Sequence, residues 1–313
     1  MNLEACLPAE LRGPSATITK IAAGLSGAGV FRVVANGQTF VLKIASAEIP
    51  VSVWRSKVQI QQLASNASVA PRVIHVDESR RAVVTAFVTD QSFPALYSNP
   101  ATREAALTLL GQTLRRVHDL PLPPGAEGKD PREFLAVMWA GPLSKSTPPA
   151  FVRDAVNGIL TEEAPVNDRP IVLSHNDVNP TNLAYDGEHL MLMDWDTAGP
   201  NDPLYDLAAI SVFLGMDDAT CQHLVAAHDD APITALTSRF SYNRRLAAVL
   251  CGSMFLHLAQ LGGHAGASGT ESIESTPSLL EFYQRMRGGS LNIATAEGQW
   301  WFGLTLLKCS FGV

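Results

Sequence analysis

Hydrophobic and polar positions change their spacing about ninety residues into the chain. Before that point, short apolar runs separated by polar turns predict strands at 30–35, 38–44, 72–76 and 82–88, with a helix at 53–64. After it, apolar residues recur three and four positions apart, which predicts helices. These helices are expected at 131–138, 150–160, 204–214, 221–227, 231–261, 277–287 and 297–309.

The change of spacing predicts an α+β fold with two lobes. We expect a small antiparallel sheet in an N-terminal nucleotide-binding lobe at 1–90, and a large helical catalytic and substrate lobe at 91–313. The helical region is expected to begin with a helix that Asn99 caps and Pro100 opens, since Pro is favoured at the first helical position. Ligand sites favour such junctions between structural regions.

Two dipeptides predict tight hairpin turns. Asn36-Gly37 separates the first two expected strands, and Asp186-Gly187 separates two shorter ones at 182–185 and 189–193. Both central positions of such turns need a positive φ, which Asn, Asp and Gly tolerate best. In the second hairpin, a two-residue turn would place Asn182 opposite Met191.

The same register would place Asp194 opposite Asn179, close to the loop that follows His175. The side chains of Asp177, Asn182 and Asp194 are therefore expected to converge. Mg²⁺ prefers oxygen ligands and takes one or two carboxylates, with phosphates and water completing its shell. Asn182 and Asp194 fit as metal ligands, and Asp177 is then available to accept the proton of an attacking hydroxyl.

A lysine in an otherwise apolar strand adds an anion-binding candidate. Lys43 lies in Phe-Val-Leu-Lys-Ile, where a buried ammonium group needs an anionic partner such as the phosphates of ATP. A loop of small residues precedes the first strand, and such loops let backbone amides approach phosphate closely. Its candidate nucleotide-binding residues are Gly24, Ser26, Gly27 and Gly29.

Composition excludes several other classes of protein. The formal net charge of -7 argues against nonspecific nucleic-acid binding, which requires clustered basic residues. The four cysteines have neither zinc-site nor disulfide-framework spacing, which favours reduced thiols in a cytoplasmic protein. No secretory leader is expected at the N-terminus, and the longest apolar stretch, 246–261, is too short to cross a membrane.

Three motifs carry a resemblance to a known family. They are H-x-D-x-x-x-x-N at 175–182, D-W-D at 194–196, and G-P-N-D-P-L-Y-D-L-A at 199–208. Together they resemble the aminoglycoside phosphotransferase and choline kinase superfamily, and are most similar to bacterial choline/ethanolamine and thiamine kinase-like proteins. The resemblance covers about 18–214 and implies a protein-kinase-like fold that uses ATP and Mg²⁺.

The resemblance also implies roles for single residues. Asp177 would be the catalytic base, Asn182 and Asp194 the metal ligands, and Lys43 the phosphate-binding lysine. His175 and Asp206 would brace the catalytic loop, and Asp196 lies where choline-kinase-like members carry Glu. The strand at 83–88 would lead into a hinge where the backbone near Ala86 and Val88 meets adenine.

The sequence departs from the family pattern at two places. Family members usually pair the lysine with a Glu on the next helix, but 53–64 contains no acidic residue, so either a Gln or Glu48 is expected as the partner of Lys43. The stretch 250–257, where choline kinases supply an aromatic cage, contains no Trp, the ring that binds cations best.

The leading hypothesis is thus an ATP-dependent kinase for a hydroxyl of a small molecule, with a choline-, ethanolamine- or thiamine-like acceptor favoured and a cationic acceptor compatible with the net charge. An aminoglycoside or another sugar is the alternative acceptor. A catalytically inactive kinase-like binding protein and a metal-dependent phosphatase are alternatives of a different class. Neither nucleic acid nor a membrane is expected as a partner.

Overall fold

The computed structural model describes every residue except 1, 22–28, 145 and 313. The chain forms two compact units, each assembled from separate segments. The first unit consists of Met1–Glu127, Val172–Asp177 and Thr181–Pro200. The second consists of Gly128–Ile171, Val178–Pro180 and Asn201–Val313.

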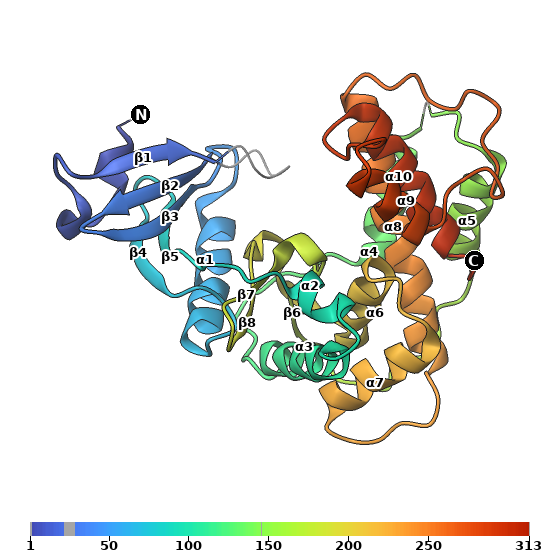
Figure 1. Cartoon of the computed structure of the whole chain (residues 1–313), viewed down its shortest axis with the longest axis horizontal. Helices are drawn as coiled ribbons and strands as arrows, with labels where there is room; N and C mark the ends of the chain where they lie inside the picture. The colour runs from blue at the N-terminus through green and yellow to red at the C-terminus, as the bar shows by residue number, and fades with distance from the viewer. Residues whose placement is uncertain (1, 22–28, 145, 313) are drawn as a thin grey trace. The chain divides into compact units, whose positions relative to one another are not determined.

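A five-stranded antiparallel sheet dominates the first unit (Figure 1). Its spatial order is β1-β2-β3-β5-β4. The strands are β1 (Thr17–Lys20), β2 (Gly29–Ala35), β3 (Gln38–Ile44), β4 (Val73–Asp77) and β5 (Ala82–Ala86). The four predicted strands are confirmed, and β1 is an additional edge strand.

The predicted turn at Asn36-Gly37 is confirmed. Ala35 pairs with Gln38, so the connection has two residues. Both of them have positive φ, 52° for Asn36 and 73° for Gly37, as a turn matched to the strand twist requires. This hairpin fixes the register of β3 and with it the face on which Lys43 lies.

Alternation along β3 sends its side chains to opposite faces of the sheet. Phe40, Leu42 and Ile44 are buried against a short N-terminal segment that includes Cys6 and Leu7. That segment contains the 3-10 helices η1 (Leu3–Cys6) and η2 (Ala9–Leu11). Lys43 therefore belongs to the other face.

Helix α1 (Val51–Asn66) covers this other face through Trp54 and Val58, which pack against Val83 of β5. Val83 is also the β5 residue that pairs with Lys43. The helix predicted at 53–64 is confirmed and is one turn longer in total. Lys43 thus emerges on the face of the sheet that α1 covers.

The predicted start of the next helix is wrong. A separate short helix, α2 (Phe93–Ser98), ends before Asn99, and α3 (Arg103–His118) begins after Thr102. The side chain of Asn99 accepts a hydrogen bond from the amide of Ala101 at 3.0 Å, forming a turn between the helices. Asn99 and Pro100 have capping chemistry, but they act between two helices.

A small hairpin completes the first unit, with strands β7 (Leu183–Tyr185) and β8 (Leu190–Leu192). Its predicted register is wrong by two residues: Tyr185 pairs with Leu190 across a four-residue turn. The Asp186 carboxylate accepts hydrogen bonds from the amides of Glu188 and His189, which stabilises the longer turn. A shift of two keeps every side chain on its predicted face.

The second unit is mainly helical. The structure confirms all the helices predicted there, although α8 begins at Ser238, where the Thr237 side chain caps the amide of Phe240, and not at 231. The helices are α4 (Pro131–Ala140), α5 (Ala150–Thr161), α6 (Pro203–Phe213), α7 (Asp218–Asp229), α8 (Ser238–Leu261), α9 (Leu279–Arg287) and α10 (Ala296–Cys309). The short strands β6 (Val172–Ser174) and β9 (Gly199–Asn201) pair with each other, and both belong to the first unit except for Asn201.

The core of the second unit lies between α8 and α10. Trp300, Leu304 and Leu307 of α10 are buried with Leu246 and Leu250 of α8. The predicted α+β class, with an antiparallel sheet and a large helical region, is confirmed. Within the described residues, no helix combines the length and apolar character that crossing a membrane requires.

Candidate active site

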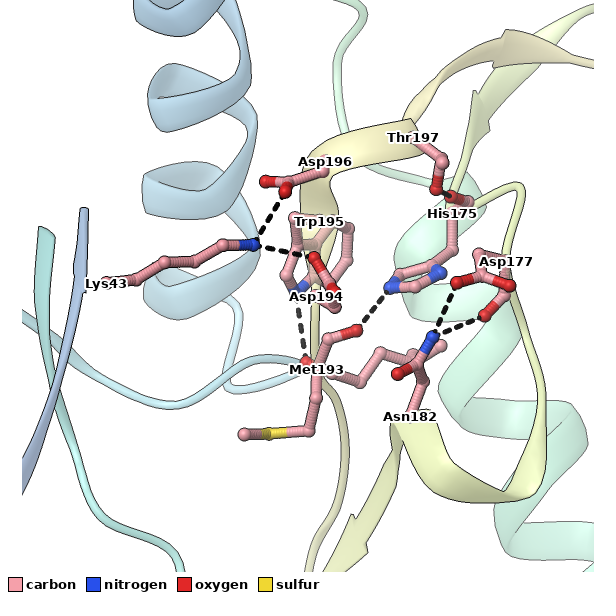
Figure 2. Close-up of polar contacts among 10 residues, drawn as sticks. Lys43, His175, Asp177, Asn182, Met193, Asp194, Trp195, Asp196 and Thr197 are labelled. Carbon is pink, nitrogen blue, oxygen red and sulfur yellow. Dashed lines mark hydrogen bonds and ion pairs between the residues drawn. The ribbon is translucent and has the colours of Figure 1, made fainter. Parts of the chain in front are cut away.

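Lys43 forms two ion pairs with the turn that follows β8. Its Nζ donates to Asp194 Oδ1 and to Asp196 Oδ2, each at 2.7 Å (Figure 2). The lysine side chain is 25% exposed, and the carboxylates are 36% and 48% exposed. The three groups are therefore held together while remaining accessible to a ligand.

The charge of Lys43 is stabilised by this arrangement. Burial by itself lowers the pKa of the ammonium group, because it disfavours the charged form. The attraction and hydrogen bonds of Asp196 and Asp194 outweigh burial, so the pKa of Lys43 lies above its ordinary value. Lys43 is thus a permanent cation near neutral pH, as binding of phosphate requires.

The expected partner of Lys43 was wrong. Neither a Gln of α1 nor Glu48 contacts its ammonium group; both hydrogen bonds go to aspartates more than 150 positions away in sequence. Glu48 is exposed, and its amide bonds to the Ser46 side chain. One of these two aspartates is Asp196, which lies where choline-kinase-like members carry Glu.

Backbone conformation aims the two carboxylates at the lysine. Asp194 has φ 59° and ψ 73°, a left-handed conformation that Asp tolerates better than most residues. The 3-10 helix η4 (Trp195–Thr197) follows directly. Trp195, between the two aspartates, is buried and donates Nε1 to the Leu192 carbonyl at 2.9 Å, which anchors the turn.

His175 fastens the same turn from the other side. It is completely buried, its Nε2 lies 2.8 Å from the Met193 carbonyl oxygen, and its ring meets Trp195 edge-on at 4.9 Å (Figure 2). Thr197 donates its hydroxyl to the His175 carbonyl at 2.9 Å. These contacts support the bracing role expected for His175.

Asp177 and Asn182 form a second polar group. Asn182 Nδ2 donates to the Asp177 carboxylate at 2.8 Å and to the Asp177 carbonyl at 2.9 Å (Figure 2). The Asn182 carbonyl accepts from the Met193 amide at 2.8 Å. Asn182 is therefore tied through its side chain to Asp177 and through its backbone to the residue preceding Asp194. The bond between Asn182 and Met193 places Asp194 next to a residue paired with Asn182, through a register that differs from the predicted one.

The donor atoms at this position suit a hard divalent cation. Asp194 supplies carboxylate oxygens, and Asn182 uses its amide nitrogen toward Asp177, which leaves its amide oxygen pointing away as a ligand atom. Within the described residues, no three His, Cys, Asp or Glu side chains form a metal-binding group by themselves. A metal here would need the amide oxygen and the phosphates of a nucleotide, which is the usual pattern for Mg²⁺.

The structure describes only some of the other residues predicted to bind nucleotide. Gly24, Ser26 and Gly27 lie outside the described residues. Gly29 begins β2, and a Cβ there would lie 2.9 Å from the Phe31 ring, so packing already favours glycine. The Ala86 amide donates to the Arg72 carbonyl at 2.8 Å, which leaves the amide of Val88 as the better donor to a base.

Asp206 lies in the other unit. It is fully buried in α6, whose first turn begins after Asp202. The Asp202 carboxylate is itself buried and accepts hydrogen bonds from Arg239 at 2.6 Å and Asn243 at 2.8 Å. No sequence pattern indicates this ion pair, and the role of Asp206 stays a prediction.

The contacts of Lys57 and Trp195 also do not follow from the sequence. Lys57 of α1 donates to the Ala198 carbonyl and thereby joins the helix to the end of the aspartate turn. Lys57 is one of two basic residues in 53–64, with Arg55, and nothing in the sequence separates their roles. Trp195 was visible within D-W-D, but its anchoring bond depends on the fold.

Solved structures of several kinases share this fold. A choline/ethanolamine kinase family protein from Mesorhizobium loti is 19% identical with a TM-score of 0.58, covering 96% of this chain and 94% of its own. Choline kinase LicA from Streptococcus pneumoniae is 14% identical with a TM-score of 0.61, covering 89% and 93%. The macrolide 2'-phosphotransferase MphH from Brachybacterium faecium is 15% identical with a TM-score of 0.57, covering 84% and 95%. These similarities define a protein-kinase-like fold.

The chain belongs to the phosphotransferase enzyme family, APH, whose sequence profile matches residues 17–237. This match covers well over half of the chain and includes Lys43, Asp177, Asn182, Asp194 and Asp196. A search of curated protein sequences found no match to the chain. The suspected superfamily is therefore confirmed, and the protein is a phosphotransferase of that family.

Proposed function

We propose that the protein transfers the γ-phosphoryl group of ATP to a hydroxyl group of a small molecule. The observation that supports this most directly is the joint placement of Lys43 on the Asp194 carboxylate with Asp177 held by Asn182, all within one compact unit. A second structure of LicA, in complex with AMP, supports nucleotide binding by this fold.

In this proposal each residue has one task. The Asp177 carboxylate accepts the proton of the acceptor hydroxyl. The hydroxyl oxygen bonds to the γ-phosphorus, and the bond from the γ-phosphorus to the oxygen that bridges to the β-phosphate breaks, so that ADP leaves. Lys43 binds phosphate oxygens, and the Val88 amide binds the base. Asn182 and Asp194 hold Mg²⁺, which neutralises phosphate charge. Phosphoryl transfer depends mainly on positioning and charge neutralisation, so no covalent intermediate on the protein is required.

A choline-, ethanolamine- or thiamine-like acceptor is favoured. The D-W-D motif and the names of two similar structures support it. In the stretch that supplies an aromatic cage in choline kinases, Phe255 packs edge-on against Phe302 at 4.7 Å and so serves the interior of the unit. Because this ring packs inside the unit, it gives no support for a quaternary ammonium cage.

A sugar hydroxyl is the second candidate acceptor, because one similar structure is a macrolide 2'-phosphotransferase. One panel of acceptor compounds distinguishes the two candidates. Purified protein with Mg·ATP would be incubated with choline, ethanolamine, thiamine, aminoglycosides and macrolides, and ADP release would be followed together with the mass of the product. A phosphorylated amino alcohol supports the favoured acceptor, and a phosphorylated antibiotic supports the other.

Asp177→Asn tests whether turnover uses the proposed base. The substitution keeps the shape of the side chain and removes its charge, so turnover should fall by about 10² to 10⁴-fold while affinity for Mg·ATP stays within about threefold. Turnover equal to that of the unmodified protein would contradict the assignment. If the protein binds Mg·ATP but turns over no acceptor, an inactive binding protein is favoured. If it releases phosphate from a phosphorylated compound when no nucleotide is present, a phosphatase is favoured.

A further inference from the structure

The lysine of this site lacks an acidic partner on the helix that packs over it. Helix α1 contains no Asp or Glu, although its buried residues Trp54 and Val58 lie on the same sheet face as Lys43. A lysine side chain has four flexible carbons and requires a fixed anion to hold its ammonium group in one position. In this chain the fixed anions come from the turn after β8.

The two aspartates of this turn have different duties under the proposed function. Asp194 would be a ligand of Mg²⁺. When its carboxylate binds the metal, its attraction for the Lys43 ammonium group is weaker. If Asp194 were the sole partner, Lys43 would compete with the metal for it. Asp196 Oδ2 lies at the same 2.7 Å from Nζ and is not needed as a metal ligand.

We propose that Asp196 is the positioning residue of Lys43. Its carboxylate replaces the acidic residue that α1 lacks, and it keeps the ammonium group oriented toward the phosphates when Asp194 turns to the metal. Asp196 acts through Lys43 and does not itself contact nucleotide or acceptor. This inference rests on the proposed function, and it also explains why the site does not require an acid on α1.

The surrounding contacts allow Asp196 this role. Trp195 fixes the backbone on one side of it through the Leu192 carbonyl, and Thr197 fixes the other side through the His175 carbonyl. Lys57 of α1 holds the Ala198 carbonyl, so the turn and the helix are joined directly. A carboxylate on so firmly held a turn can replace one on the helix itself.

The test is a double-mutant cycle with Lys43→Ala and Asp196→Asn, read first by calorimetric binding of the non-hydrolysable analogue AMP-PNP with Mg²⁺. Each single substitution should weaken binding about tenfold or more. The double variant should bind within about twofold of Lys43→Ala, because Asp196 has no effect once the lysine is absent. If Asp196 had a purely structural role, Asp196→Asn would lower the affinity by the same factor in the unmodified protein and in Lys43→Ala.

Two further readouts distinguish positioning from packing. Asp196→Glu keeps the charge and should recover most of the affinity. Asp196→Asn should also raise the Mg²⁺ concentration that gives half-maximal nucleotide binding, because Lys43 then competes with the metal for Asp194. Glu188→Gln, an exposed carboxylate on the same hairpin, is the matched control and should leave binding unchanged. Circular dichroism and melting temperature establish that each variant is folded.

The outcomes separate this inference from the proposed function. If the unmodified protein does not bind Mg·AMP-PNP, the nucleotide site and the inference fail together. If it binds and Lys43→Ala weakens binding but Asp196→Asn does not, only the inference is wrong. Additive losses in the double variant would also overturn it.

Discussion

Lys43 shows how one residue can carry a large functional effect and a small structural one. Its two ion pairs are short, but all three side chains are between one quarter and one half exposed. Solvent screens such pairs, so their net contribution to stability is small. The value of the arrangement lies in orienting a cation.

Lys43→Ala should therefore lower nucleotide affinity and turnover without unfolding the protein. We expect the free energy of unfolding to change by no more than about 1 kcal/mol, whereas nucleotide affinity and turnover should both fall by at least tenfold. Denaturant unfolding and calorimetric titration with Mg·ATP measure the two quantities. A loss of several kcal/mol in stability with unchanged affinity would show that the lysine is structural.

Asp77 gives a prediction for stability against pH. The hydroxyl of Ser79 donates to its carboxylate at 2.6 Å, and Arg80 donates to it at 2.7 Å; although partial burial opposes them, these contacts lower the pKa of Asp77 to about 2. Because the folded pKa lies below the unfolded one, this stabilisation is complete above about pH 4 and disappears as pH falls through about 2.

The comparison is with Asp77→Asn, which cannot ionise. Its melting temperature should lie below that of the unmodified protein at pH 6, and the difference should shrink as pH falls from about 4 toward 2. Thermal melts followed by circular dichroism at several pH values measure it. A difference that stays constant over this range would rule out the carboxylate as its source.

At the scale of secondary-structure elements, two glycines set the distance between α8 and α10. A Cβ on Gly252 would lie 2.7 Å from Leu307 Cγ and 2.8 Å from the Gly303 carbonyl oxygen. A Cβ on Gly303 would lie 2.8 Å from the Gly252 carbonyl oxygen. The helices therefore touch backbone to backbone at this crossing, where no larger residue fits.

Gly252→Ala should destabilise the protein by about 1 to 3 kcal/mol, since overpacking at this contact outweighs the better helix propensity of Ala. Gly158→Ala in α5 is the matched control: its position is exposed and helical, and a Cβ there meets nothing within 4 Å. That variant should be more stable by about 0.5 to 1 kcal/mol. Equal effects of the two substitutions in urea unfolding would refute the close crossing.

Element identity could be predicted from the sequence where the local pattern was strong. The turn at Asn36-Gly37 followed from its dipeptide, and most helices followed from periodicity. The hairpin after Asn182 did not, because the Asp186 side chain stabilises a four-residue turn that competes with the two-residue one. The Asn99 error has the same origin: capping residues also form turns between helices, and only the fold selects one use.

The sequence indicates candidate residues for the site but not the contacts that they make. Asp177, Asn182 and Asp194 lie within eighteen positions, so one hairpin could bring them together. The partners of Lys43 are 151 and 153 positions away, and no local pattern indicates such a pairing. The sequence signal was the absence of an acidic residue from α1, which indicates that a partner of Lys43 comes from another element.

For the whole molecule, the proposed nucleotide-binding residues all belong to the first unit. Mg·ATP should therefore slow amide hydrogen exchange in β3 and in the segment around Asp194. The helices α8 and α10 form the core of the second unit and should change little without an acceptor. Exchange measured by mass spectrometry, with and without Mg·ATP, tests this distribution. Protection confined to α8 and α10 would place the nucleotide elsewhere.

The discontinuity of the first unit has a consequence for how the protein is made. Its segments are separated by Gly128–Ile171, so a ribosome completes the sheet long before it supplies Val172–Pro200. During that interval Lys43 has no counterion from the turn, and the growing chain must close a loop of more than 150 residues to provide one. A nascent chain stalled before Asp194 should thus carry a folded sheet that cannot yet bind nucleotide.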